Sequence, residues 1–249
     1  MAYLSKIRIN PMRQKSRILL ANPQHIHAMI QAGIAQQPVA ERTLWRLDDD
    51  DQRAPNLLIL TGTRPDWNHI VEQAGWPDAD GEHYLIRPYE PLLQIAAVGR
   101  EFAFKITASP VQNTTTPDKL TPAQETRRAA EGDRRRGYRI GHRTAAAQTK
   151  WFLERAPRLG FTIPELVLDV DRPVPDMRIV RRESRKFTKG RDGHKHTVRI
   201  ETATFEGRLK ITDAEVFRHT LLAGIGPSKA YGCGLLTLAS IGAGRRPGN

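Results

Sequence analysis

The chain has 249 residues and a formal net charge of +12, because 39 lysines and arginines outnumber 27 aspartates and glutamates. Its 39% hydrophobic and 27% charged content is typical of a globular protein, which excludes a collagen, a mucin or a wholly disordered chain. No apolar run approaches the ~18 residues of a membrane span, and Cys233 is the only cysteine, so we expect a cytoplasmic protein with no membrane partner and a polyanion such as nucleic acid as its main partner.

The first 97 residues predict four strands and two helices. Alternating apolar residues favour a strand over residues 3–10, and Asn22 followed by Pro23 is typical of an N-cap with proline at the first helical position. An apolar stripe then predicts a helix that packs on a sheet. Further strands are expected at residues 43–47, 57–60 and 84–92, with a short helix at 63–73. This β-α-β-β-α-β order is the ferredoxin-like motif.

Residues 98–241 repeat this order. A strand at 102–106 and a helix at 144–155 precede two long strands, 166–181 and 197–212, which form a hairpin; a helix at 213–223 and a strand at 235–241 follow. The polar stretch 111–139 is expected to be a mobile insertion, and the tail 242–249 to be disordered. The fold class is therefore α+β, with two tandem ferredoxin-like domains, 1–97 and 98–241.

Basic charge gathers on two segments. Nine cations and two acids lie between residues 178 and 199, on the expected hairpin, and a second arginine cluster lies within 127–143. Acids gather at residues 48–51, so we expect a molecule with sides of opposite sign. A charge run can simply be a solvated face, but two clusters at this net charge favour nucleic acid. The candidates for gripping an RNA duplex are Arg181, Arg182, Arg185, Lys186 and Lys189.

A glycine-rich segment, GIGPSKAYGCG at residues 224–234, joins the last helix to the last strand. It can bring backbone N–H groups against a phosphate. It matches neither a dinucleotide fingerprint nor a Walker loop, because it runs into a strand and has no Gly-Lys-Ser/Thr step. The structural alternative is a tight turn that lets the last strand pass close to its neighbours. The candidate RNA-binding residues here are Gly226, Lys229 and Tyr231.

Four segments carry a family resemblance: YLSKIRIN at residues 3–10, LANPQHIH at 20–27, TATFEGRLKITD at 202–213 and GIGPSKAYGCGLLTL at 224–238. In this order they resemble the CasE family, the CRISPR repeat-RNA endoribonucleases of the type I-E Cascade complex. The resemblance implies two ferredoxin-like domains and an enzyme that cuts a repeat stem-loop without a metal or other cofactor. It also implies that the protein stays bound to the guide RNA, with other Cascade subunits as partners.

The implied reaction is attack of a 2′-hydroxyl on the adjacent phosphorus, which leaves a 2′,3′-cyclic phosphate and a 5′-hydroxyl. The position that matches the family's catalytic histidine is His27. The family carries a tyrosine three residues earlier, and here that position is Gln24. Glutamine can orient a hydroxyl but cannot exchange a proton at neutral pH. Another group, such as Tyr231, Lys229 or His25, would then assist His27.

Two other hypotheses remain at this stage. Gln24 raises the possibility of a stem-loop RNA-binding subunit of the same complex without catalysis. A general DNA-binding protein is disfavoured, since no helix-turn-helix, zinc or basic-zipper signature is present. A metal site is not predicted either, because His25 and His27 project about 200° apart around a helix and cannot hold one ion together.

Overall fold

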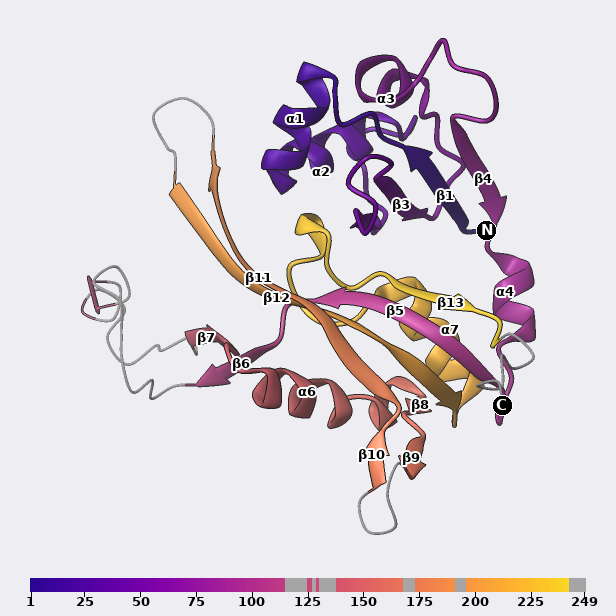
Figure 1. Cartoon of the computed structure of the whole chain (residues 1–249), viewed down its shortest axis with the longest axis vertical. Coiled ribbons are helices and arrows are strands. Elements are labelled where there is room, and N and C mark those ends of the chain that lie inside the picture. Colours follow the sequence, from indigo (N-terminus) through magenta and orange to yellow (C-terminus); the bar gives the residue numbers. More distant parts are fainter. Residues whose placement is uncertain (115–124, 127–128, 130–137, 168–172, 191–195, 242–249) are drawn as a thin grey trace, which may run out of the picture.

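Figure 1 shows the computed structural model, which describes residues 1–114, 125–126, 129, 138–167, 173–190 and 196–241. Two antiparallel sheets organise these residues, one in each half of the chain. Both sheets place the strands of their β-α-β-β-α-β unit in the spatial order second, third, first, fourth. This repeated order is the ferredoxin-like arrangement, and it confirms the predicted fold class.

The N-terminal sheet has the strand order β2 (Leu44–Asp48), β3 (Asn56–Thr61), β1 (Tyr3–Arg8) and β4 (Tyr84–Pro88). Helices α1 (Gln14–Ala21), α2 (Pro23–Ala32) and α3 (Asn68–Ala74) accompany it. Ile26 and Ile30 of α2 pack with Ile7 and Ile59 of the sheet in one buried cluster. The predicted stripe of this helix therefore faces the sheet.

The C-terminal sheet has the strand order β11 (Met177–Lys189), β12 (His196–Ile211), β5 (Glu101–Ala108) and β13 (Leu236–Ala239), with β8 (Phe161–Thr162) beside β12. Helices α6 (Ala145–Leu153) and α7 (Ala214–Ala223) cover its apolar side. The Phe152 ring stacks between Phe104 and Phe205, with centroids 5.6 and 4.8 Å away. Leu44 and Leu60 of the N-terminal sheet belong to the same cluster, so the two halves share a core.

Several predicted elements need correction. Helix α1 was not predicted, and α4 (Glu90–Ile95) occupies the end of the strand expected at 84–92. The strand expected at 166–181 is wrong, since β9 (Glu165–Val167) and β10 (Pro173–Pro175) form a separate ribbon before β11. Prolines at both ends of β10 cannot donate to a sheet, which keeps this strand short.

The expected insertion begins and ends in paired strands, β6 (Val111–Thr114) and β7 (Tyr138–Gly141). Strands β11 and β12 confirm the predicted hairpin. The hairpin tip at 191–195, most of the insertion and the tail at 242–249 lie outside the described residues. The described residues also include two short 3-10 helices, η1 (Pro157–Leu159) and η2 (Lys229–Tyr231). Within the described ranges, none of the helices is both long and apolar enough to cross a membrane.

The side chain of Arg46 on β2 joins the two halves. It is 2% exposed, and its Nε and Nη2 donate to the two oxygens of Asp48 at 2.7 and 2.9 Å. Its Nη1 donates to the carbonyls of Lys105 and Leu235 at 2.7 and 3.2 Å, and Nη2 also reaches Thr237 Oγ1 at 2.9 Å. One guanidinium therefore fixes β2 against β5 and the start of β13.

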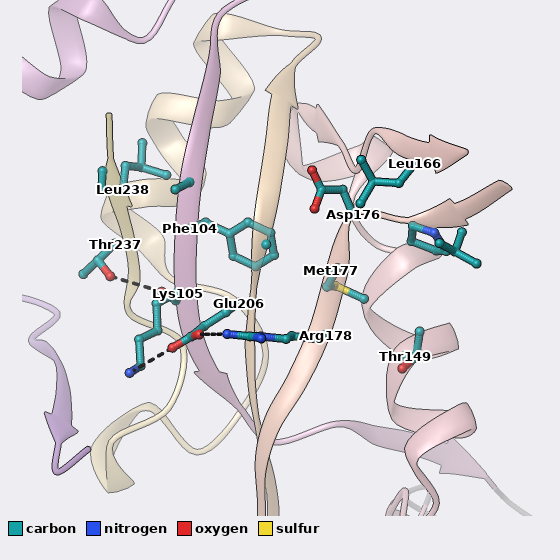
Figure 2. Close-up of a pocket in the computed structure, with 15 residues that line it drawn as sticks. Phe104, Lys105, Thr149, Leu166, Asp176, Met177, Arg178, Glu206, Thr237 and Leu238 are labelled. Carbon is teal, nitrogen blue, oxygen red and sulfur yellow. Dashed lines mark hydrogen bonds and ion pairs between the residues drawn. The ribbon is translucent and has the colours of Figure 1, made fainter. Parts of the chain in front are cut away.

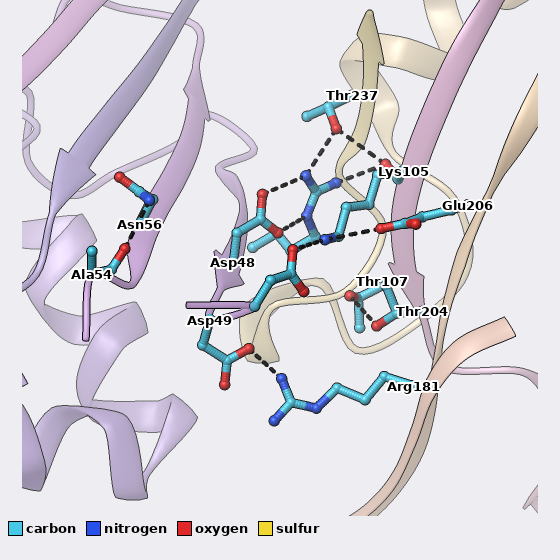
Figure 3. Close-up of polar contacts among 12 residues, drawn as sticks. Asp48, Asp49, Ala54, Asn56, Lys105, Thr107, Arg181, Thr204, Glu206 and Thr237 are labelled. Carbon is cyan, nitrogen blue, oxygen red and sulfur yellow. Dashed lines mark hydrogen bonds and ion pairs between the residues drawn. The ribbon is translucent and has the colours of Figure 1, made fainter. Parts of the chain in front are cut away.

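The acidic run beside Arg46 does not form a separate negative side of the molecule. Asp50 pairs with Lys105 of β5, and Asp49 pairs with Arg181 of β11 (Figure 3). Together with the Asp48–Arg46 pair, these contacts place three acids of the run against cations of the protein itself. The expectation of sides of opposite sign is therefore wrong at this location, because the opposite charges pack together.

We expect Arg46→Met to lower the free energy of unfolding by roughly 3–5 kcal/mol, because it leaves a carboxylate and two carbonyls without their buried donor. Urea denaturation followed by circular dichroism measures this. Arg53→Met removes an exposed guanidinium from the loop between β2 and β3 and should change stability by less than about 0.5 kcal/mol. Equal losses in the two variants would contradict a joining role for Arg46.

Candidate active site

The first turn of α2 is fixed to the end of β11. The Asn22 side chain accepts a hydrogen bond from Gln24 N at 3.0 Å, and Pro23 follows as the first helical residue, as predicted. Asn22 Nδ2 also donates to the carbonyl of Thr188 at 3.4 Å. The N-cap that starts the helix therefore also places it beside the basic hairpin.

His27 lies one turn further along α2 and is half-buried. Its Nδ1 is enclosed and has no hydrogen-bond partner among the described residues, so the other ring nitrogen, Nε2, is the candidate for contact with a substrate. Burial, and then the positive charge of Lys189, lower the pKa of His27 below its ordinary value of 6.5. The imidazole is therefore mainly neutral at pH 7 and can accept a proton.

The glycine-rich loop packs against α2 and β2 through η2. Gly232 has a φ of +81°, and a Cβ at this position would lie 2.9 Å from the Trp45 ring. Gly234 N donates to the carbonyl of Thr107 at 2.8 Å, which ties the loop to β5. Between these glycines, Cys233 is fully buried, and burial raises the pKa of its thiol to about 12. The chain before the last strand therefore does pass close to its neighbours, which is the structural reason expected for the glycines.

The three other predicted residues of this loop lie in different surroundings. Gly226, with a φ of +78°, lies against Trp151, so a side chain would not fit there easily. Lys229 is half-buried, and burial and then the charge of Arg42 lower the pKa of its amine. Tyr231 ends η2, which packs against α2, so it lies on the side of the loop that faces the histidine helix.

The Tyr231 ring contacts two residues of β11. Phe187 meets it edge to face, with ring centroids 4.8 Å apart and planes at 63°. The Lys189 ammonium lies 6.0 Å from the centroid of the same ring, within cation–π range. Elements α2, β11 and η2 thus bring His27, Lys189 and Tyr231 together from three distant parts of the sequence.

The arginines predicted to grip RNA are engaged within the protein. Arg181 pairs with Asp49 and Glu183, and Arg185 pairs with Glu183 at 2.7 Å. Arg182 points to the other side of the strand, where its Nε donates to Gln148 Oε1 at 2.9 Å and the guanidinium also contacts the carbonyl of Arg143. Lys186 is exposed and makes no polar contact with any described residue.

A groove of about 590 Å³ connects these residues to α2. Pro23 and Ile26 of α2 and Trp45 of β2 form one wall, and residues 183–187 of β11 form the other. The acids in it, Asp49 and Glu183, were not predicted as site residues. Asp49 lies 132 positions before Arg181, so sequence spacing gives no signal for this pair.

A larger hollow of about 770 Å³ lies over the C-terminal sheet (Figure 2). Its charged residues neutralise one another, since Lys105 and Arg178 both pair with Glu206, at 3.1 and 3.6 Å. Neither α2 nor η2 contributes to its lining. We therefore place the candidate active site at α2, where His27 directly follows the groove-lining Ile26, and not in this hollow.

Within the described part of the chain, no group of three or more His, Cys, Asp or Glu side chains could hold a metal ion. His25, two residues before His27, is exposed and has its Nδ1 3.5 Å from the carbonyl of Ile18. Gln24 is half-buried in the first turn of α2. The side chains gathered around His27 thus offer amine, amide and phenol groups beside its imidazole.

The model of a family described as "CRISPR associated protein" matches residues 2–240. The chain belongs to the CRISPR-associated CasE family. It is 28% identical to the CRISPR-associated endoribonuclease Cse3 of Thermus thermophilus over 242 residues, which cover 95% of this chain and 99% of that protein. It is also 49% identical to the Cascade subunit CasE of Escherichia coli K12 over 43 residues, 17% of this chain and 22% of that protein.

A solved structure of Thermus thermophilus Cse3 bound to an RNA that represents a pre-cleavage complex has the same fold as this CasE family member. The TM-score is 0.67 and the identity 26%, over 96% of this chain and 98% of that one. The family resemblance expected from four short segments is therefore confirmed over nearly the whole chain.

We expect Gly232→Ala to destabilise the protein more than Gly99→Ala. Both positions have positive φ angles, of +81° and +84°, so both variants incur a backbone cost of roughly 1–2 kcal/mol. Only Gly232 faces a ring, whereas a Cβ at Gly99 has nothing within 4 Å. Overlap with Trp45 should add roughly 1–3 kcal/mol in urea denaturation. Equal losses of stability in the two variants would show that the Trp45 ring moves aside at no cost in free energy.

Proposed function

We propose that this CasE family member is a metal-independent endoribonuclease that cleaves CRISPR repeat stem-loop RNA and stays bound to the guide RNA, together with other Cascade subunits. The observation that carries the proposal is the position of His27, a half-buried imidazole on α2 that lies within electrostatic range of Lys189 and directly follows Ile26, which lines the groove. The names of the relatives support it, since Cse3 is an endoribonuclease whose solved structure holds RNA.

In the proposed reaction the 2′-oxygen bonds to the adjacent phosphorus and the bond from phosphorus to the 5′-oxygen breaks. Neutral His27 accepts the 2′-hydroxyl proton at Nε2, and the departing 5′-oxygen takes up a proton from the resulting imidazolium or from water. The products are a 2′,3′-cyclic phosphate and a 5′-hydroxyl. The Lys189 ammonium stabilises the negative charge that builds up on the phosphate oxygens. Gln24 can orient a hydroxyl group but takes no part in proton transfer.

The RNA would be held between the two ferredoxin-like domains, which we take as residues 1–97 and 98–241. Lys186 is free to contact a phosphate, while Arg181 and Arg185 must share their charge between RNA and the acids that they already contact. Arg182 is bound to α6 and would act mainly by fixing the hairpin. Lys229, Tyr231 and the backbone at Gly226 are the proposed contacts of the glycine-rich loop. The strand-like hairpin suits the narrow major groove of an A-form stem.

The second candidate is a stem-loop RNA-binding subunit that does not cleave. Gln24 favours this alternative, because the residue one turn before His27 cannot supply a proton. The two candidates predict the same RNA affinity and different products, so an assay that resolves the chemical nature of the RNA ends distinguishes them.

We expect the protein to cleave a repeat stem-loop RNA in EDTA and to leave a 2′,3′-cyclic phosphate end. His27→Ala should slow single-turnover cleavage roughly 100- to 10,000-fold with RNA affinity within a few-fold, because it removes only the proton acceptor. His219→Ala on α7, an exposed histidine outside the groove, is the matched control and should cleave normally.

A 2′-deoxy nucleotide at the cleavage position should block the reaction completely, since the attacking hydroxyl is gone. Cleavage of that substrate, or a cyclic-phosphate product made by His27→Ala at the normal rate, would contradict the proposed mechanism. A shifted RNA complex without any product would favour the binding subunit.

The cleavage rate should stay near its plateau at pH 7 and fall only below pH 6.5. The reason is that burial and Lys189 lower the pKa of His27, so the neutral, proton-accepting form persists to a lower pH than in a free histidine. Single-turnover rates measured from pH 5 to 8 test this. An acidic limb centred above 6.5 would mean that His27 is not the base or that Lys189 lies further away during the reaction.

A further inference from the structure

We propose that Tyr231 is a positioning residue whose ring holds the Lys189 ammonium beside His27. This inference rests on the proposed role of His27 and names the residue that prepares its surroundings. Tyr231 itself need not touch the reacting atoms for this role. Its action passes through Lys189.

The contact between the ring and the lysine has a rigid support. Phe187 and Lys189 are two residues apart on β11, so their side chains leave the same face of the strand. Phe187 is 6% exposed and meets the Tyr231 ring edge to face at 4.8 Å. The buried phenylalanine therefore holds the ring in place, and the ring in turn faces the ammonium at 6.0 Å.

Lys189 needs such a partner because it is exposed near the end of β11. A lysine side chain in this setting has four rotatable bonds and spreads over many rotamers in water. It makes no ion pair with any described residue. The aromatic face gives the ammonium one preferred place, since a cation over a ring is attracted by the ring's negative face.

The backbone fixes the position of the Tyr231 ring, and with it the preferred position of the Lys189 ammonium, relative to His27. Tyr231 N donates to the carbonyl of Ser228 at 2.9 Å, and residues 228 and 232, with φ angles of +62° and +81°, bend the chain on either side of η2. Helix η2 packs against α2, and Asn22 at the start of α2 bonds to Thr188 of β11. The segment with Tyr231, strand β11 and helix α2 are thus each in contact with the other two.

No acid is among the causes that shift the pKa of His27, which are burial and then Lys189. The elements packed against α2 contribute Lys229 and Tyr231 from η2, Lys15 and Arg17 from α1, and His69 and Glu72 from α3, and α2 itself carries His25. Neither α1, α2 nor η2 contains an aspartate or glutamate. Glu183 of β11 is engaged by Arg181 and Arg185. The position of the Lys189 charge therefore affects how much neutral imidazole is present.

The test is an NMR titration of His27 in the RNA-free protein, with the His27 signal assigned by its absence in His27→Ala. Tyr231→Phe keeps the aromatic face and should titrate like the wild type. Tyr231→Leu keeps apolar volume without the face, so the pKa of His27 should rise towards its value in Lys189→Met. Adding Tyr231→Leu to Lys189→Met should produce no further shift, because the charge that the ring holds is already gone.

Cleavage supplies a second readout. Tyr231→Leu should slow single-turnover cleavage by roughly two- to fivefold more than Tyr231→Phe does, which is the size of one exposed cation–π contact. If His27→Ala cleaves normally while the titrations behave as expected, the proposed catalytic role of His27 is wrong and the positioning contact stands.

Two outcomes would overturn the positioning role itself. One is a Tyr231→Leu protein whose His27 titrates as in the wild type, and the other is a shift that persists in the Lys189→Met background. Should Tyr231→Leu fail to fold, nuclear Overhauser effects between the Lys189 ε-methylene and the Tyr231 ring protons decide the question in the wild-type protein. Their absence would also end the proposal.

Discussion

The relative position of the two ferredoxin-like domains depends on the buried guanidinium of Arg46. All five of its N–H groups have acceptors. Two of these are the carboxylate oxygens of Asp48, and the other three lie on Lys105, Leu235 and Thr237, in or next to the strands β5 and β13. A buried charge is tolerated only when it is paired and hydrogen-bonded in this way, so any rotation between the domains would leave donors unsatisfied.

The neighbouring residue on β2, Trp45, faces the other way and packs against Gly232. The same strand that fixes the domains therefore also supports the loop that carries Tyr231.

The pairing of the acidic run with arginines and lysines changes the meaning of the high net charge. A formal charge of +12 suggests a broad cationic surface, yet Arg181, Arg185 and Lys105 are each matched by a carboxylate in the protein. A phosphate that approaches Arg181 competes with Asp49 for the same guanidinium. Weak, non-specific polyanions gain little from such a site, whereas a well-fitted duplex can offer several phosphates at once.

Local features were predictable from the sequence, and long-range ones were not. Asn22, Pro23 and the apolar stripe of α2 act within a few residues, so the helix and its packing face followed from pattern alone. Helix α1 was missed because it has only eight residues and leaves Ile18 51% exposed, so it lacks a clear stripe. The prediction of one strand over residues 166–181 was wrong because the prolines of β10 keep this short strand separate from β11. The contacts of Tyr231 with Phe187 and Lys189 depend on tertiary packing that no spacing encodes, and the roles of the predicted site residues stay predictions.

The burial of Cys233 makes the single thiol a natural reporter of domain opening. With no exposed surface and a thiol pKa near 12, it is shielded from alkylating reagents while the loop stays between β2 and β5. Reaction with such a reagent requires that the loop leave its position between β2 and β5. This movement also separates Tyr231 from α2. The kinetics of alkylation would therefore measure how often the loop leaves its place between β2 and β5, in a protein that carries no engineered label.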